Sequence, residues 1–312
     1  MAGKAKRKQK HAYVVVNLEG ENLGPDWENY SRALGLEIRE IDGKTEEMPK
    51  VGKGEVAFLM GGNQTATTAE IAASCPYLQG QVDLVNRIID GQKGLAVGVN
   101  LGAQIIAHAV EPDCTKPSGI IRIGESAVHI DPGNEPSRQA FSGDVPFQAV
   151  NFNSYGIYFS EPELDVTMLA TSGNYKQFPF EAFYVFDETS VPRAFGTAYH
   201  GEPAEYFARI FKSLEYRDFL GTGEDVFTFL RKKAAEGLVY SGGKPLAPNS
   251  PVLTRRGFAK LSQEHELERR IAGIHSLHNT VVLSGTAEKA RAQSALVETL
   301  AEAGRGYLGK LK

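Results

Sequence analysis

The sequence predicts an α/β fold: a mostly parallel sheet flanked by helices, with an antiparallel extension and a helical C-terminal region. Three observations support it. Strand-length apolar runs alternate with helical segments over residues 13–110, short β-rich segments follow over residues 120–186, and the strand signal fades beyond about residue 219. Strands that alternate with helices are typical of a parallel sheet, whereas closely spaced strands separated by turns are typical of antiparallel pairing.

The first part of the chain supplies the parallel strands. Residues 13–18 are continuous and β-branched, as expected of a strand buried on both faces. The run at 55–60 ends abruptly in Gly61-Gly62-Asn63, and the run at 94–99 leads directly into a helix. The predicted strands are 13–18, 36–41, 55–60 and 94–99, and the predicted helices are 26–34, 76–90 and 101–110.

The rest of the chain divides into the β-rich extension and a helical tail. A Gly/Pro/Ser-rich stretch at 241–251 is interpreted as a linker. The domains are expected to be a disordered basic tail at 1–11, an α/β domain at 12–218 and a helical region at 219–312. The remaining predicted elements are a strand at 194–199 and helices at 203–214, 224–237, 258–278 and 286–303.

Composition limits the classes of function. The 42% of hydrophobic and 23% of charged residues are typical of a globular protein, and 34 basic against 38 acidic side chains argue against a broad nucleic-acid-binding face. Nucleic acid is therefore expected to be bound, if at all, through the basic tail. Two cysteines make no disulfide scaffold, and no run approaches the ~18–20 apolar residues of a membrane span. No apolar segment follows the basic start, so a cytoplasmic protein is expected.

One strand-to-helix junction has the pattern of a nucleophile elbow. Gly98-Val99-Asn100-Leu101-Gly102 places two glycines around a central side chain, which a sharp turn would lift above the sheet edge. The following helix N-terminus and the Gly61-Gly62 loop would supply backbone N–H groups to a developing oxyanion. His200 and Glu202 stand two apart at a strand end, where a base and its orienting carboxylate belong.

With these motifs in order, residues 12–214 resemble the class I (triad) glutamine amidotransferases, especially the stand-alone domains of the GMP-synthetase type. That family has G-x-C-x-G-x-Q at the elbow and G-x-Q-x-H-P-E later, where this chain reads GVNLGAQ and GTAYHGE. GGNQ stands where the family has GGP. The resemblance implies a flavodoxin-like sheet and a partner synthetase, but neither a metal nor a cofactor.

The resemblance also assigns roles to individual residues. It places Asn100 at the nucleophile position, with His200 and Glu202 as the rest of the triad. It implies substrate contacts from four further residues, which are Gly61, Gly62, Leu101 and Gln104.

Several positions depart from the family pattern. Asn100 replaces the cysteine, and an amide has no accessible anionic form near neutral pH, so it cannot replace a thiolate. Asparagine does tolerate a left-handed backbone better than most residues, so the turn can survive the loss of the thiol. The family's paired histidines in the middle segment correspond to Asn151 and Asn153, and Ala198 and Gly201 replace the Gln and Pro around His200.

Three functions follow as alternatives. In the first, the chain is a binding or accessory subunit without normal glutaminase activity. In the second, it is an enzyme of altered chemistry, in which His200 and Glu202 promote amide hydrolysis or amine transfer without a thiol. In the third, it is an amidotransferase inactivated by an engineered Cys-to-Asn change. No P-loop or adenylation motif is visible, so activation of a substrate with ATP is not expected from this chain alone.

Each site residue also has a purely structural interpretation. Asn100 would be a turn residue, His200 and Glu202 a remnant pair joined by a local hydrogen bond, and Gln104 a polar residue at a helix N-terminus. His275 and His278 are three apart on a predicted helix, which suits a metal, but no suitable third ligand is evident.

Overall fold

The computed structural model describes residues 9–18, 21–62, 64–131, 133–141, 147–162, 164–172, 177–200 and 224–310. Within these residues, eleven strands form one sheet in the order β11-β10-β5-β7-β8-β9-β4-β3-β1-β2, and β6 pairs with β5 outside that path. The strands are β1 (His11–Val16), β2 (Glu37–Asp42), β3 (Val56–Leu59), β4 (Leu95–Val99), β5 (Thr115–Ile130), β6 (Phe147–Ile157), β7 (Val166–Ser172), β8 (Ala182–Phe186), β9 (Pro192–Thr197), β10 (Val239–Ser241) and β11 (Lys244–Pro245).

The sheet confirms the predicted fold class. β9, β4, β3, β1 and β2 run parallel to one another, and β3 and β4 are buried along their whole length. β5, β6, β7 and β8 form the predicted antiparallel extension, which joins the parallel part where β8 pairs with β9. The predicted strands and helices of residues 13–110 are all present, and no end is shifted by more than two residues.

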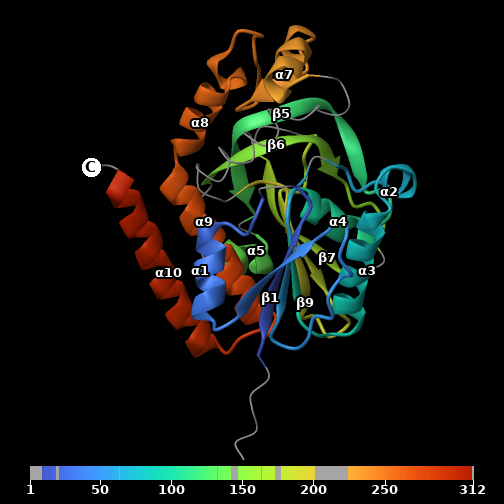
Figure 1. The fold of residues 1–312 in the computed structure, drawn as a ribbon, viewed down its shortest axis with the longest axis vertical. Coiled ribbons are helices and arrows are strands. Elements are labelled where there is room, and N and C mark those ends of the chain that lie inside the picture. The colour runs from blue at the N-terminus through green and yellow to red at the C-terminus, as the bar shows by residue number, and fades with distance from the viewer. Residues whose placement is uncertain are drawn as a thin grey trace, which may run out of the picture.

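Helices cover both faces of the sheet (Figure 1). One apolar cluster combines β1 and β3 side chains with α1, α9 and α10, and the other combines the opposite faces of these strands with α3 and α4. The parallel part of the sheet is therefore buried between two layers of helices. The helices are α1 (Pro25–Ala33), α2 (Thr68–Ala73), α3 (Tyr77–Asp90), α4 (Leu101–Val110), α5 (Glu135–Phe141), α7 (Val226–Ala235), α8 (Arg255–Gln263), α9 (Glu266–Leu283) and α10 (Lys289–Lys310), with a 3₁₀ turn at Pro251–Leu253.

The C-terminal region differs from the prediction in two places. Part of the expected linker forms a hairpin, in which a turn with positive φ at Gly242 and Gly243 joins β10 to β11. β10 also pairs with β5, so the hairpin extends the sheet. The expected single helix at 258–278 is broken between α8 and α9. Arg269, fully buried, donates to the carbonyl oxygens of Ser262 (2.6 Å) and Glu264 (3.4 Å), so its guanidinium satisfies acceptors that a helix end leaves open.

Two expectations fall wholly or partly outside the described residues. The helix predicted at 203–214 lies entirely outside them, and so do residues 1–8 of the basic tail. β1 already begins at His11, inside the range assigned to that tail. In the part of the chain that the structure describes, no helix is both long and apolar enough to cross a membrane.

Polar contacts join α9 to the α/β part of the chain. Arg270 donates from Nε and Nη2 to the two carboxylate oxygens of Asp26 on α1, both at 2.7 Å, and also contacts Glu266. The Trp27 indole donates to the carbonyl of Gly273 at 3.2 Å. These side chains lie between helices and are largely shielded from water, so the contacts hold α9 in one orientation against α1.

Removing one partner of this ion pair should destabilise the protein strongly. Arg270→Ala would leave Asp26 and Glu266 buried without their guanidinium, and the loss of one partner of a buried pair costs about 3–5 kcal/mol. Arg32→Ala removes an exposed helix pair with Glu28 and should cost less than about 1 kcal/mol. Urea unfolding of both variants checks the difference. Equal losses would contradict the assigned role of Arg270.

Stability should also fall in mild acid. Burial lowers the pKa of His278, with neighbouring His275 adding to the effect, and His278 Nδ1 lies 3.0 Å from the Tyr30 hydroxyl. The unfolded chain takes up protons below about pH 6.5 while the folded histidine resists them, so unfolding is favoured as the pH falls. His278→Gln should reduce the loss of unfolding free energy between about pH 7 and about pH 5. Urea midpoints at both pH values measure it, and an unchanged difference would exclude His278 as a source.

Candidate functional site

The predicted elbow forms a sharp backbone turn. Asn100 lies between β4 and α4 with φ 53° and ψ −106°, and its N–H donates to the carbonyl of Thr197 in β9 at 2.8 Å. A side chain on Gly98 would collide with the backbone of Gly102, and one on Gly102 would overlap the Leu59 carbonyl of β3. The two glycines are therefore required because α4 packs directly against the sheet.

The structure brings three of the predicted site residues together. A side chain added to Gly61 would begin 3.7 Å from Asn100 Cβ, 3.7 Å from His200 Cε1 and 2.8 Å from Glu21 Oε1. Asn100, His200 and Glu21 are all largely buried, with 8%, 8% and 6% of their surfaces exposed. We call Glu21, Gly61, Asn100 and His200 the elbow site.

The other predicted residues border this site or lie outside the described residues. Gly62 faces Leu101, because a side chain added at Gly62 would begin 2.7 Å from Leu101 Cδ2. Gln104 is buried, and its Oε1 accepts from the N–H of Ala66 at 3.2 Å, which joins α4 to the loop after β3. Glu202 lies outside the described residues, as do Asn63 and Gly201.

The backbone of β6 accepts hydrogen bonds from two residues of the elbow site, Asn100 and His200. Asn100 Nδ2 donates to the carbonyl of Phe152 at 3.3 Å, and the N–H of His200 donates to the carbonyl of Val150 at 2.9 Å. The Asn100 amide is thus directed towards the β6 backbone. Because β6 contacts both residues, it fixes the position of the turn relative to the imidazole.

A buried ion pair supports the segment that leads to His200. Arg122 and Glu181 are fully buried and joined through two guanidinium–carboxylate contacts, and Arg122 Nε donates to Asn153 Oδ1 at 3.1 Å. Asn153 Nδ2 in turn donates to the carbonyl of Ala198 at 3.1 Å, and the N–H of Ala198 donates to the carbonyl of Glu181 at 2.8 Å. Asn153 therefore joins the ion pair to the backbone two residues before His200.

The second asparagine of the middle segment has a separate contact. Asn151 is fully buried, and its Nδ2 donates to Ser126 Oγ at 2.5 Å. Sequence reasoning associated Asn151 and Asn153 with a histidine pair, whereas the structure shows both amides in contacts between β6 and its neighbours. Arg122 and Glu181 were missed because charged residues among short strands are ordinarily exposed.

Glu21 is the one residue of the elbow site that sequence reasoning missed. It follows β1 in the chain, and its N–H donates to the carbonyl of Leu18 at 3.0 Å. A carboxylate just beyond the carboxyl end of a buried parallel strand was the available signal, since ligands in open α/β sheets bind at that edge.

Neither cysteine can act as a ready thiolate. Cys75 and Cys114 are buried, and burial raises the pKa of Cys75 and raises that of Cys114 to about 12. A thiol is a nucleophile only in its ionised form, so neither residue supplies one near neutral pH. In the described part of the chain, no group of three or more His, Cys, Asp or Glu residues has the arrangement of a metal site.

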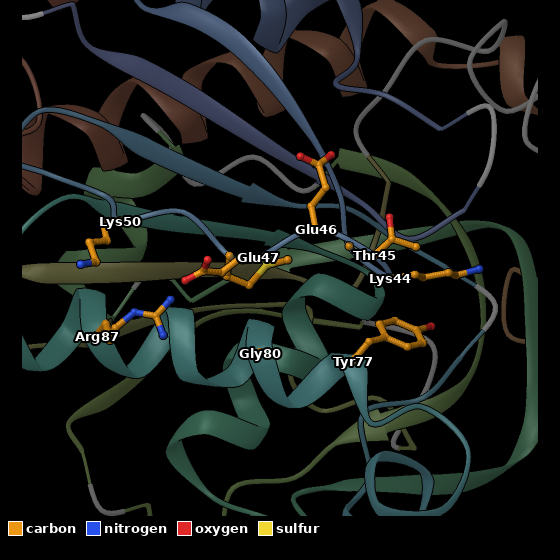
Figure 2. Close-up of a pocket in the computed structure, with 10 residues that line it drawn as sticks. Lys44, Thr45, Glu46, Glu47, Lys50, Tyr77, Gly80 and Arg87 are labelled. Carbon is orange, nitrogen blue, oxygen red and sulfur yellow. The ribbon is translucent and has the colours of Figure 1, made fainter.

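A separate cavity of about 460 Å³ lies between the β2–β3 connection and α3. Figure 2 shows Lys50 and Arg87 at one end and Lys44 and Tyr77 at the other, with Gly80 on the helix between them. None of its lining residues belongs to the elbow site. A side chain added to Gly80 would meet only Met48 Cγ, at an ordinary contact distance of 3.6 Å.

Two helical glycines should respond to alanine in opposite ways. Gly102→Ala should destabilise the protein by about 1–3 kcal/mol, because its methyl group overlaps the Leu59 carbonyl. Gly80→Ala should stabilise it by about 0.5–1 kcal/mol, because alanine restricts the unfolded chain and the methyl group fits. Thermal or urea unfolding measures both changes. A tolerated Gly102→Ala would contradict the close contact of α4 with β3.

The comparisons with known proteins agree with this fold. No family model and no curated protein sequence matches the chain. A solved glutamine amidotransferase from Thermotoga maritima is similar, with a TM-score of 0.60 and 15% identity over 88% of this chain and 99% of that one. A glutamine amido transferase from Methylobacillus flagellatus has a TM-score of 0.54 and 17% identity over 85% and 95%. At these identities, the similarity shows that the chain has the fold of the class I glutamine amidotransferases.

Proposed function

We propose that this chain is a glutamine amidotransferase-like protein without normal glutaminase activity, and that it acts as a binding or accessory subunit of a partner enzyme. The observation that carries the proposal is Asn100 at the elbow turn. We assign its side chain to the nucleophile position of the family, and the contact that supports the assignment is the hydrogen bond from its amide to the Phe152 carbonyl at the sharp turn. An amide nitrogen is delocalised, so it does not attack a carbonyl as a thiolate does.

The contacts around the turn support retention of a binding site. Gly61, Asn100 and His200 still face one another, and Gln104 joins the elbow helix to the loop after β3. This geometry depends on the close packing at Gly98 and Gly102. It also depends on the buried Arg122–Glu181 ion pair, which Asn153 of β6 joins to the backbone before His200. We infer that the roles assigned to Gly61, Gly62, Leu101 and Gln104 are ligand contacts of this site.

The partner we propose is a synthetase or another modifying enzyme. The amidotransferase-like unit is residues 12–218, and the mainly helical region is residues 219–312, whose α9 and α10 pack beside α1. The outer surface of that helical layer is one place for the partner to bind. Nucleic acid would be contacted only through the basic tail, and the compartment we propose is the cytoplasm.

An enzyme of altered chemistry is the second candidate. The observation that favours it is the carboxyl group of Glu21 beside the same glycine as His200. An imidazole close to a carboxylate can act as a general base towards water or an amine. Under this alternative His200 remains catalytic and the thiol is unnecessary, with Glu202 retained in the role of the family's triad carboxylate.

Glutamate release from glutamine separates the two candidates. The purified protein should release no more glutamate than a protein-free blank, because loss of the nucleophile of a triad lowers the rate by several orders of magnitude. His200→Ala should behave identically. Release by the unmodified protein that disappears in His200→Ala would overturn the proposal and establish the altered chemistry.

A further inference from the structure

The cavity between the β2–β3 connection and α3 has walls that are held in place by hydrogen bonds. Gln81 of α3 donates from Nε2 to the carbonyl of Gly43 at 3.3 Å and to Asn17 Oδ1 at 2.6 Å, and all three residues are buried. Asp42 Oδ1 accepts from the N–H of Lys44 at 2.9 Å, which shapes the start of the connection. The cavity is therefore formed before any ligand binds, and its volume of about 460 Å³ is in the range of small-molecule sites.

Gly80 leaves one side of the cavity open. It lies inside α3, one turn from its start, where glycine is less favourable than alanine. A side chain there would meet only Met48 Cγ, at 3.6 Å, so packing does not require a glycine at this position. A helix position without a side chain lets another molecule approach the backbone closely. Met48 and the ring of Tyr77 border this position and supply apolar surface.

The side chains around the cavity carry more positive than negative charge. Figure 2 shows Arg87 and Lys50 at one end, and neither forms an ion pair with a described residue. Glu47 also lines the cavity, so the two cations exceed it by one charge. Glu46 accepts from a backbone N–H of β2 at 2.8 Å, and its charge is balanced by Lys44. The guanidinium is a planar set of donors that matches the oxygen atoms of an acidic group.

We propose that this cavity binds a small organic anion, whose acidic group pairs with Arg87 and Lys50 and whose flat apolar body lies over Gly80 between Met48 and Tyr77. The acidic group is an oxygen-bearing one, such as a carboxylate or a phosphate. The inference does not depend on the elbow site, because none of the residues of that site lines the cavity.

Two fluorescent probes test this site. Anilinonaphthalenesulfonate carries an acidic group on a flat aromatic body, and phenylnaphthylamine has the same body without the charge. Each probe is titrated into the unmodified chain, Arg87→Gln and Gly80→Leu. The matched controls are Arg39→Gln, which removes an exposed arginine of β2 that does not line the cavity, and Gly80→Ala, whose methyl group fits. Thermal unfolding establishes that each variant is folded before affinities are compared.

The expected result is binding that depends on both the charge and the open space. Arg87→Gln should weaken binding of the sulfonate probe by at least about threefold and leave the neutral probe unchanged, because only the acidic group contacts the guanidinium. Gly80→Leu should weaken both probes by at least about tenfold, because its side chain fills the space that the aromatic body needs. Arg39→Gln and Gly80→Ala should keep both affinities.

Competition then identifies the acidic group. Naphthoate and naphthyl phosphate should each displace the sulfonate probe from the unmodified chain, and the one that displaces it at the lower concentration carries the preferred group. Displacement by neither would contradict a site for such anions.

Three further results would overturn the inference. If the folded protein does not bind the sulfonate probe, the cavity is not a site for this class of ligand. Equal weakening by Arg87→Gln and Arg39→Gln would mean that the probe responds to surface charge in general. An unchanged affinity in Gly80→Leu would place the bound probe elsewhere on the protein. The proposed function at the elbow is unaffected by any of these outcomes.

Discussion

The turn at Asn100 is the constraint on which the rest of the site depends. β4 and β9 are parallel neighbours, and the Asn100 N–H continues their pairing by donating to Thr197. α4 must then start immediately and pack so close to β3 that Gly102 contacts the Leu59 carbonyl. A residue held at positive φ between these elements faces Gly61 whatever its side chain. The fold can therefore present an asparagine side chain at this turn.

The parallel part of the fold and its turn could be predicted because their signals are local. Continuous apolar runs, the G-x-N-x-G spacing and the helical periodicity of residues 76–90 all correspond to elements of the structure. The roles of Asn100, His200 and the glycines remain predictions, and Glu202 lies outside the described residues. The β10–β11 hairpin was missed because two strands of three and two residues carry almost no pattern of their own.

Features that depend on distant contacts could not be predicted from local patterns. Arg122 and Glu181 are 59 positions apart and stabilise each other only because β5 and β8 belong to one sheet. Glu21 lies in the elbow site because of the position of the β1 connection. Arg270 pairs with Asp26 because α9 packs on α1. A charged side chain has the same sequence signal whether it is solvated or paired in the interior, so only the tertiary contacts distinguish these roles.

The elbow presents its side chain to Gly61, and a disulfide between the two positions tests this arrangement directly. The separation of 3.7 Å between Asn100 Cβ and an added Gly61 side chain falls within the range of about 3.5–4.5 Å that a disulfide requires. On mild oxidation, Gly61→Cys/Asn100→Cys should form the bridge between these positions, detected by peptide mass, while Gly62→Cys/Asn100→Cys should not. Absence of the bridge in the first variant, or equal formation in both, would contradict the account.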